Sequence, residues 1–435
     1  MAEAVDRDPA TSGDLDAEMY ELARRLYPIC RSITGGGVRE TLRIIGEVVP
    51  IDVTEVPSGT PVLDWTVPRE WNIRDAWIAD PSGNRIVDFR RSNLHVVSYS
   101  TPIHERMSLA ELRPHLHTLP EHPNWIPYRT SYYKEAWGFC LTQRTLDGLV
   151  DGEYEVRIDS TLGDGSLTYG EVVVPGTVQD EVLISTHVCH PSLADDNVSG
   201  MAVAAFLARH FARRPRRLTL RFLFAPGTIG AITWLSRNQD RVGRIRAGLT
   251  LTCLGDSHPF TYKRTVFGAA EIDRVVPRAL ASMSLPHDVI DYFPYGYDER
   301  QYNSPGFRLP VGSLMRGRHG RFPEYHTSAD DLSFITAERL GESWRVLERA
   351  IELIDKGRRF RNLAPLGEPQ LGRRGLYRAI GGTDIAELEH AMLWALSLSD
   401  GEHSVDDIVQ RSGLSSEVIS AAVELLTAKG LLSEV

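Results

Sequence analysis

A histidine and two carboxylates stand close together in the segment THVCHPSLADDNVSG, directly after a dense apolar run. His187 comes at the end of that run, and Asp195 and Asp196 precede a stretch with helical spacing. Zinc prefers nitrogen and oxygen ligands in a tight tetrahedron, and a nearby helix N-terminus favours a carboxylate anion. A histidine in such a place is also a common hydrogen-bonded structural residue, so the spacing alone leaves both interpretations open.

A second histidine motif, PEYHTSADDLSFI, places His326 in a loop before another expected helix. Together His187, Asp196 and His326 would supply three ligands and leave a fourth position for water, as in a catalytic zinc site. Zinc lowers the pKa of a bound water towards neutrality and makes it a nucleophile. On their spacing alone, these three residues are candidate ligands for Zn²⁺. His190, in the same segment as His187, is either an outer partner of this site or a surface residue.

Three arginines, Arg300, Arg316 and Arg318, lie in the segment that leads to His326. Most arginines only solvate a surface. Arginines clustered near a metal pocket would instead bind a carboxylate or phosphate group of a substrate through paired hydrogen bonds. We therefore treat these three as candidate substrate-binding residues.

Alternating strand and helix patterns between the two motifs indicate an α/β sheet. Apolar runs at 181–186, 218–224 and 248–254 are typical of buried strands, and helical spacing occurs at Met201–Phe211 and Ile229–Asn238. This order predicts a mixed, mostly parallel sheet flanked by helices on both faces. Ligands of such sheets bind beyond the carboxyl ends of the strands, where His187 stands.

The 435 residues are too many for one small core, and their pattern changes along the chain. One metal-binding domain is assigned to two separate stretches: residues 15–50, which have helical spacing, and residues 154–360, which have the α/β pattern. Between them, 51–150 is typical of an inserted β-rich module, because short alternating runs are broken by proline, glycine and asparagine. After an expected helix at Ala337–Lys356 and a linker, three helical patterns in 372–435 predict a winged-helix module.

The charge and composition of the chain argue against several classes of partner. The 48 basic and 58 acidic residues give a net charge of −10, so no general field attracts nucleic acid or an anionic membrane. The four cysteines form no CxxC pair, the first residues lack the apolar core of a secretory signal, and no run of about 18 apolar residues suggests a membrane span. We expect a cytoplasmic protein with reduced thiols.

The C-terminal module could suggest DNA binding, but its charge does not favour it. Residues 372–435 contain five basic residues against ten acidic ones. Since phosphate contacts normally dominate affinity for DNA, binding to nucleic acid is not expected. A homo-oligomer contact, a contact with another protein, and simple packing as a covering domain all remain open for this module.

The two histidine motifs resemble those of a known enzyme family. THVCHPSLADDNVSG resembles the H…DNxSG segment of the M28-type zinc aminopeptidases, and PEYHTSADD resembles their late histidine motif. The chain is similar above all to a bacterial branch of aminopeptidase-like proteins, often encoded near polysaccharide or natural-product genes. These combine an M28-like domain, an inserted β module and a C-terminal winged helix. Motifs from YPICRSITGGGVRETL to YDERQYNSPGFRLPVGSLMRG extend the resemblance over nearly the whole chain.

The resemblance implies that His187 and His326 are metal ligands and that Asp196 is the carboxylate shared between two metal positions. Two-metal enzymes of this type also need a Glu–Glu pair after the next strand and an aspartate after the one that follows. Those places read APGTIG and LTCLGD here, so that Thr228 and, by register, Thr252 leave a second metal without its own ligands. The resemblance therefore implies one firm metal position, although Asp256 could still reach the site.

Gly227 is the main departure from the family pattern, since the branch usually has a glutamate there. That glutamate takes a proton from the attacking water, and general-base catalysis of this kind is worth ~10²–10⁴-fold. Another carboxylate could replace it, and the candidates are Asp298, Glu299 and Glu324. Cys189 also differs, because M28 enzymes usually carry there an aspartate that orients the first histidine; we expect Cys189 to be a small packed residue.

The resemblance thus implies a zinc-dependent hydrolase of the aminopeptidase or amidase type. Its substrate would be small, with an amide or peptide-like bond, and its place would be in a biosynthetic pathway. The departure at Gly227 leaves a second hypothesis, a catalytically degenerate scaffold that binds a metal or ligand and works through protein contacts.

Overall fold

The computed structural model describes residues 12–376 and 383–435, and the chain divides into two compact units, Met1–Arg349 and Ala350–Val435. Each unit is described by itself. Within the described ranges, no helix is both long enough and apolar enough to cross a membrane.

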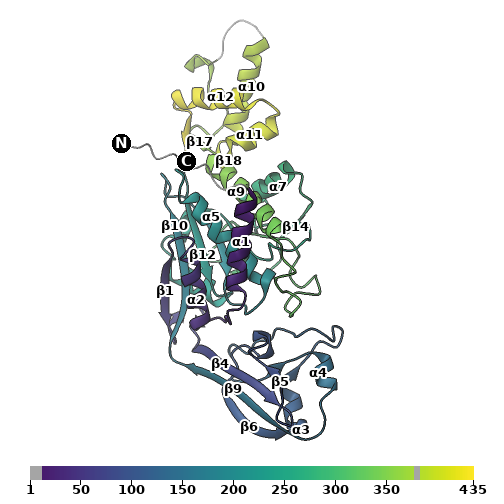
Figure 1. The fold of residues 1–435 in the computed structure, drawn as a ribbon. Coiled ribbons are helices and arrows are strands. Elements are labelled where there is room, and N and C mark those ends of the chain that lie inside the picture. Colours follow the sequence, from purple (N-terminus) through teal and green to yellow (C-terminus); the bar gives the residue numbers. More distant parts are fainter. Residues whose placement is uncertain (1–11, 377–382) are drawn as a thin grey trace, which may run out of the picture. The chain divides into compact units, whose positions relative to one another are not determined.

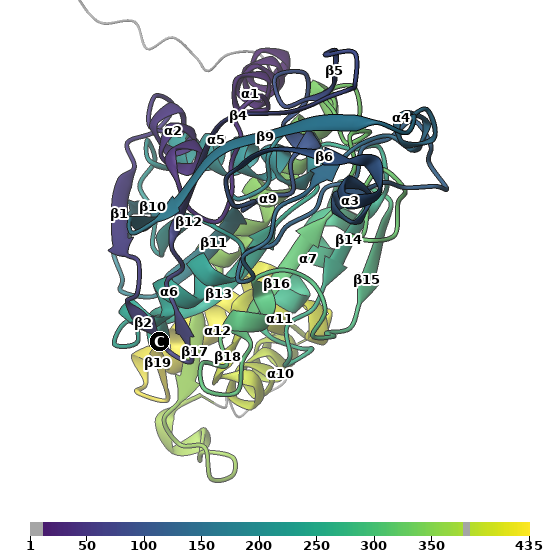
Figure 2. The ribbon, with the colours of Figure 1, turned by 90° about the horizontal axis from the view of Figure 1, so that it is seen from below.

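The first unit is built on an eight-stranded sheet with the strand order β1-β10-β12-β11-β13-β16-β14-β15 (Figures 1 and 2). The four neighbours β12, β11, β13 and β16 are parallel, whereas β10 and β14 run antiparallel to them. Every residue of β11 and β13 is buried, as the apolar runs predicted. The predicted mixed, mostly parallel sheet is confirmed. The strand bounds are β1 (Asp52–Pro57), β10 (Ser166–Val174), β12 (Thr219–Ala225), β11 (Glu181–His187), β13 (Ile245–Leu251), β16 (Val311–Met315), β14 (Phe260–Lys263) and β15 (His287–Ile290).

Helices cover both faces of this sheet, as its buried strands require. Figure 2 shows α1 and α5 on one side of the sheet and α6 on the other. The N-terminal and central helices lie close to the stretches with predicted helical spacing, and α9 has the expected bounds. The described α-helices of this unit are α1 (Ser12–Leu26), α2 (Gly36–Ile45), α3 (Leu109–Leu112), α4 (Gln143–Asp147), α5 (Gly200–Phe211), α6 (Ile229–Arg237), α7 (Glu271–Ser282), α8 (Glu299–Tyr302) and the start of α9 (Ala337–Lys356).

A second, antiparallel sheet with the order β5-β4-β9-β6 forms the β-rich module (Figure 1). It has its own core, which includes Ile78, Val87 and Val156. The strand assignments differ at both ends from the expected module at 51–150. β1 pairs with β10 in the large sheet, and β9 extends the module beyond residue 150. The strands of this four-stranded sheet are β4 (Glu70–Ala79), β5 (Arg85–Asp88), β6 (Ile103–Ser108) and β9 (Glu153–Gly163).

After the end of α9, the described residues of the second unit combine three α-helices with a three-stranded sheet of order β18-β17-β19, the arrangement of a winged helix. Phe360, Ile408 and Ile419 belong to its own buried core. The predicted helices are present, but the unit begins before residue 372. The stretch that looked like a linker contains β17, which pairs with both other strands. The elements are β17 (Arg359–Asn362), α10 (Thr383–Leu398), β18 (Asp400–Ser404), α11 (Val405–Ser412), α12 (Ser416–Ala428) and β19 (Leu432–Glu434).

Candidate metal centre

The two histidine motifs meet at the carboxyl edge of the large sheet. His187 is the last residue of β11, and Asp196 lies in the short helical segment Ala194–Ser199 that leads into α5. His326 comes from the loop between β16 and α9. The carboxyl ends of β11, β12, β13 and β16 lie at the same edge because these strands are parallel.

Asp196 is the central group of the site. His187 Nε2 lies 2.8 Å from Asp196 Oδ1, and His326 Nε2 lies 2.9 Å from Asp196 Oδ2. The carboxylate is 0% exposed. Burial alone would raise the pKa of Asp196, but the neighbouring His190 imidazole and the hydrogen bonds with His187 and His326 hold that pKa well below its usual value. The carboxylate is therefore ionised and available as a ligand.

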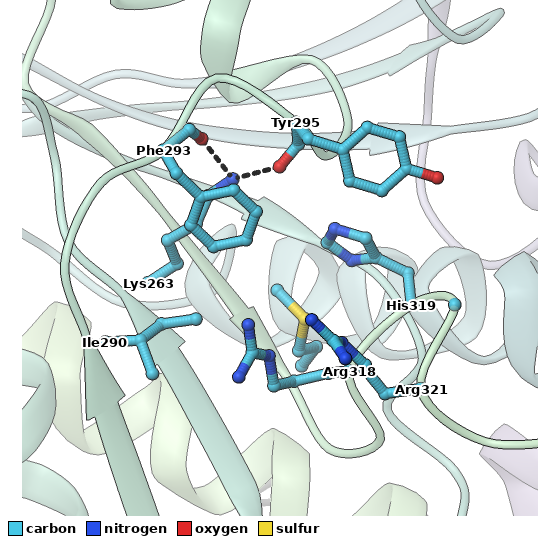
Figure 3. Close-up of a pocket in the computed structure, with 9 residues that line it drawn as sticks. Lys263, Ile290, Phe293, Tyr295, Arg318, His319 and Arg321 are labelled. Carbon is cyan, nitrogen blue, oxygen red and sulfur yellow. Dashed lines mark hydrogen bonds between the residues drawn. The ribbon is translucent and has the colours of Figure 1, made fainter.

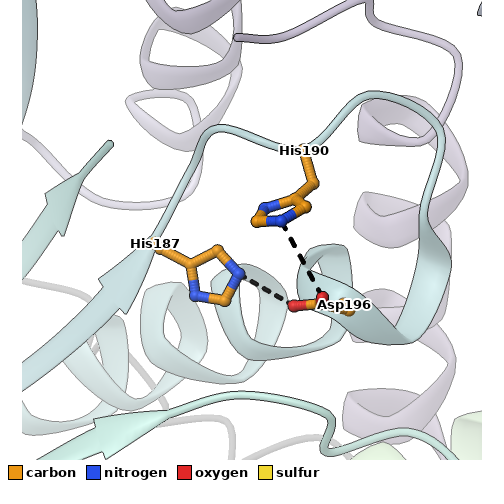
Figure 4. Close-up of side chains that lie close together, drawn as sticks. All are labelled: His187, His190 and Asp196. Atoms are coloured by element: carbon orange, nitrogen blue, oxygen red, sulfur yellow. Dashed lines mark hydrogen bonds and ion pairs between the residues drawn. The ribbon is translucent and has the colours of Figure 1, made fainter. Parts of the chain in front are cut away.

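The His190 ring lies close to the rings of both His187 and His326. Figure 4 shows how His190 approaches Asp196. Its Nε2 lies 3.9 Å from Asp196 Oδ2, and its ring centroid lies 4.9 Å from that of His187 and 5.0 Å from that of His326. Ligand atoms of His187, His190 and Asp196 all lie within 4.8 Å of one another, and burial lowers the pKa of His190 so that it stays neutral. His190, which the sequence left open, therefore belongs to the site.

The donor set is one that zinc accepts. It consists of three imidazoles and one buried carboxylate, and zinc sites in proteins use these nitrogen and oxygen ligands. His187 and His326 approach different oxygens of Asp196, while His190 shares one of them. The predicted trio does not form one close group by itself; His190 links its two halves.

A second buried carboxylate fixes the position of Asp196. Asp330 accepts hydrogen bonds from the backbone N–H groups of Asp195 (2.6 Å) and Asp196 (3.0 Å). Burial raises the pKa of Asp330 to about 8. On the other side, Asn197 Nδ2 lies 3.2 Å from His187 Nδ1 and 2.7 Å from a threonine hydroxyl of β11. These contacts hold the first ligands in place, as outer partners do in metal sites.

Three tyrosines surround the histidines. The Tyr297 ring stacks on His187 with centroids 4.3 Å apart, and the Tyr325 ring stacks on His326 at 3.9 Å. Their hydroxyls are 2.9 Å apart. Tyr128, from the β-rich module, contacts His326 edge-on, and its backbone N–H donates to the His326 carbonyl. Sequence reasoning missed these residues, although Tyr297 and Tyr325 stand directly before Asp298 and His326.

Asp298 lies next to the turn at Gly227, where the family pattern has a glutamate. Its Oδ1 accepts a 2.6 Å hydrogen bond from the backbone N–H of Thr228, the neighbour of Gly227. A Cβ at Gly227 would lie 3.7 Å from His187 Cβ, so this turn borders the metal site. Burial raises the pKa of Asp298 to about 6, against a smaller lowering by the Thr228 N–H and by His187. A carboxylate thus lies beside the site, supplied by a loop far along the chain.

Backbone strain gathers around the same edge. Thr228, Cys253 and His326 have φ angles of 62°, 49° and 58°, in the left-handed region that side chains with a Cβ rarely adopt. Thr228 follows β12, Cys253 follows β13, and His326 is one of the candidate ligands. Residues held in such conformations cluster at functional sites, because the surrounding structure must maintain them.

Glu299, the second candidate base, is held in an ion pair. Its Oε1 lies 2.5 Å from Lys263 Nζ, and both side chains are 0% exposed. Lys263 also donates to the carbonyls of Phe293 and Tyr295, and Tyr297 N–H donates to the Glu299 carboxylate. A carboxylate engaged in this way is not free to accept a proton from water, so the structure favours Asp298 over Glu299 as the base.

We expect Lys263→Met to lower the free energy of unfolding by about 3–5 kcal/mol, because it leaves Glu299 buried without its counter-charge. The double variant Lys263→Met/Glu299→Gln should recover most of that loss, since an uncharged pair has no buried charge to desolvate. Urea denaturation followed by tryptophan fluorescence measures both changes. Equal destabilisation by the single and double variants would contradict the assignment of Glu299 to a structural ion pair.

The other predicted site residues lie in different surroundings. Glu324 is partly exposed beside His326 and remains a candidate base. Arg300 lies on α8, where its charge acts on Asp298, and Arg300 therefore remains a candidate for binding substrate.

Arg316 is 3% exposed and donates to Glu342, Ser343 and the His258 carbonyl. Its guanidinium is therefore engaged by groups inside the protein and is not available to a substrate. Arg318 lines a separate cavity.

The places for a second set of metal ligands are filled otherwise. Thr252 is 0% exposed, and its hydroxyl contacts Cys253 Sγ. The Asp256 carboxylate binds the imidazole of His258 and accepts from the backbone N–H of Gly317, so it is engaged away from the metal centre at Asp196. Cys189 accepts a 3.1 Å hydrogen bond from Gly227 N–H, and burial raises the pKa of its thiol to about 12. It is the packed residue that the sequence suggested.

Solved structures of zinc aminopeptidases share this fold. BSAP, a zinc aminopeptidase from Bacillus subtilis, has a TM-score of 0.57 at 13% identity and covers 80% of this chain and 95% of its own. A protein from Clostridium acetobutylicum with a crystal structure, provisionally named a peptidase, has a TM-score of 0.83 at 48% identity, with 98% and 97% of the two chains covered. The fold is that of the M28-type zinc aminopeptidases, which confirms the predicted resemblance.

The family follows from the sequence matches. Residues 20–357 match the family described as domain of unknown function DUF4910, and residues 358–434 match a winged helix-turn-helix family. The chain therefore belongs to the DUF4910 family. A relative from Clostridium acetobutylicum is 49% identical over 425 residues, 98% of each chain, and its name combines a provisional role in polysaccharide biosynthesis with an aminopeptidase-like domain.

Proposed function

We propose that this protein is a zinc-dependent hydrolase that cleaves an amide or peptide-like bond in a small substrate of a biosynthetic pathway. The observation that carries the proposal is the Asp298 carboxylate bonded to Thr228 N–H, beside the turn at Gly227 where the family glutamate is absent. The name of the 49% identical relative supports a pathway of polysaccharide synthesis. The four cysteines form no disulfide bond in the structure, which supports a location in the cytoplasm. The acidic C-terminal module supports a partner other than nucleic acid.

The residues divide the work of hydrolysis among them. His187, His190, Asp196 and His326 would hold the zinc ion, which polarises a carbonyl and acidifies a bound water. Asp298 takes the proton of the attacking water as the C–O bond forms, and returns it to the leaving amine as the C–N bond breaks. With a pKa of about 6, Asp298 is ionised at neutral pH and is a good match for both steps.

Tyr297 is placed to stabilise the developing negative charge. Burial raises the pKa of Tyr297 well above its usual value, so its hydroxyl keeps its proton and can donate a hydrogen bond. Its ring lies against His187 and its hydroxyl against that of Tyr325, which fixes its direction. A donor held in place before the reaction stabilises an oxyanion without a cost of reorganisation.

Purified full-length protein, incubated with Zn²⁺ and then with a panel of aminoacyl amides and short peptides, tests the proposal. We expect release of free amine by the wild type, and its loss both in His187→Ala and after treatment with a chelator, because each removes the ion. Amine release that is unchanged by both treatments would exclude a zinc-dependent hydrolase.

Gly227 supports the alternative of a scaffold that binds a metal or ligand without turnover. It predicts zinc by elemental analysis but no cleavage of any amide in the panel. A variant of Asp298 distinguishes the two hypotheses, because this carboxylate transfers a proton in the hydrolase but has no catalytic role in the scaffold. A zinc-loaded wild type without turnover, in which Asp298→Asn changes only stability, would favour the scaffold.

A further inference from the structure

A cavity of about 240 Å³ lies beyond the carboxyl end of β16, beside the metal centre. Figure 3 shows Lys263, Phe293 and Tyr295 on one side of it, and Arg318, His319 and Arg321 on the other. The last three come from the loop that follows β16, at the sheet edge that also carries His187. Its volume suits a small chemical group and not a stretch of peptide.

The charge of the cavity is positive and unbalanced. Lys263 is neutralised by Glu299 and saturated by two carbonyls, so it contributes little. Arg318 and Arg321 differ from it: within residues 12–376 and 383–435 neither guanidinium has an ion pair or a side-chain hydrogen bond. Arg318 instead lies 5.8 Å from the Phe293 ring centroid. Arg318 is half-buried and Arg321 is exposed at the mouth of the cavity. Two positive charges that line one cavity without a counter-ion favour an anion there.

His319, which lines the cavity, carries an unpartnered ring nitrogen. Its side chain is 8% exposed, and its Nδ1 is buried without a hydrogen-bond partner. A buried polar nitrogen left unpaired costs free energy, so a ligand that bonded to it would recover that cost. The two arginines and this imidazole line the same side of the cavity (Figure 3).

The cavity is one aromatic side chain away from the candidate metal ligands. The His319 ring contacts the Tyr297 ring edge-on with centroids 5.2 Å apart, and the Tyr297 ring also stacks on His187 with centroids 4.3 Å apart. A group bound in the cavity and a bond held at Asp196 could therefore belong to one small molecule.

We propose that this cavity binds a phosphate group of the substrate whose amide bond is cleaved at the metal centre. The inference rests on the proposed function for the identity of the bond, but the binding site stands on its own geometry. A phosphate presents three oxygens and a charge of up to −2, which match two guanidinium groups and one imidazole more closely than the two oxygens and single charge of a carboxylate do. The substrate class is thus a small phosphorylated amide.

Isothermal titration calorimetry with inorganic phosphate tests this assignment on the full-length protein. The test variant is Arg318→Gln/Arg321→Gln, and the matched control is Arg113→Gln/Arg144→Gln, which removes the same charge from exposed positions of the β-rich module. We expect phosphate to bind the wild type and the control alike, and the test variant at least about tenfold more weakly. Equal binding by the test variant and the control would overturn the proposal.

Two further arms separate the cavity from the metal and phosphate from carboxylate. His187→Ala, which should lose zinc, is expected to bind phosphate as the wild type does; loss of binding there would place the anion on the metal and overturn the proposal. Acetate should bind more weakly than phosphate, and acetate binding of equal strength would refute a phosphate site. If phosphate binding depends on the two arginines while no amide is cleaved, the cavity stands and the proposed hydrolase fails.

Discussion

Asp196→Asn is expected to abolish stable zinc binding, with zinc per chain falling to background after dialysis. Both His187 and His326 approach Asp196 within hydrogen-bonding distance, and Asp196 is fully buried. Asparagine keeps its shape but removes the negative charge that a divalent ion needs. Loss of an outer partner of a metal site already costs roughly 10–100-fold in affinity, and loss of a direct ligand should cost more.

Elemental analysis and competition with a chromophoric chelator measure this effect. Asp331→Asn is the matched control, because Asp331 is partly exposed and, among the described hydrogen bonds, its carboxylate accepts only from Ser333. We expect the control to retain zinc. Full zinc occupancy in Asp196→Asn would show that the ion binds elsewhere, and the proposed centre would then be wrong.

The same measurement on single histidine variants locates the ion within the centre. His187, His190 and Asp196 form the close group of ligand atoms, whereas His326 approaches the carboxylate from the other oxygen. We therefore expect His190→Ala to lose more zinc than His326→Ala. The opposite order would place the ion on the His326 side of Asp196.

Asp298→Asn is expected to lower kcat by ~10²–10⁴-fold while zinc content stays unchanged, because it removes the base but keeps the oxygen that accepts from Thr228 N–H. In the wild type, the rate should rise with pH as Asp298 loses its proton near pH 6. The variant should lack that rise. A pH–rate profile with chelator-treated blanks measures both effects, and an unchanged profile would assign the base elsewhere, with Glu324 as the next candidate.

Stability should move in the opposite direction from activity in Asp298→Asn. The pKa of Asp298 is raised from 3.8 to about 6 by burial, so its contribution to stability is full below pH 4 and is lost as the pH rises through 6. Above that range the ionised group costs about 3 kcal/mol, which asparagine avoids. We expect the variant to resist urea better than the wild type at pH 8 and equally at pH 4. If Asp298 had a purely structural role, its replacement would instead lower the stability of the protein.

Local patterns in the sequence were enough to predict the main elements. The buried run that ends at His187 is β11, and the helical spacing at Ala337–Lys356 is α9 with the same bounds. Hydrophobic periodicity reports burial of a single element, and a dense apolar run has few alternatives in a sheet. Strand partners were harder: β1 and β9 each joined a different sheet from the one that their position along the chain suggested.

The order of residues along the chain by itself determined the chemistry available at this site. It placed two histidine motifs, a shared aspartate and a glycine in place of a glutamate within recognisable segments. Only the tertiary structure decided how these groups are used. Adjacent along the chain, Asp298 and Glu299 were equal candidates, yet one carboxylate bonds to Thr228 and the other to Lys263. Neighbouring side chains at the start of a helix point in different directions, so packing against distant segments, and not spacing, determines which of them is free to react.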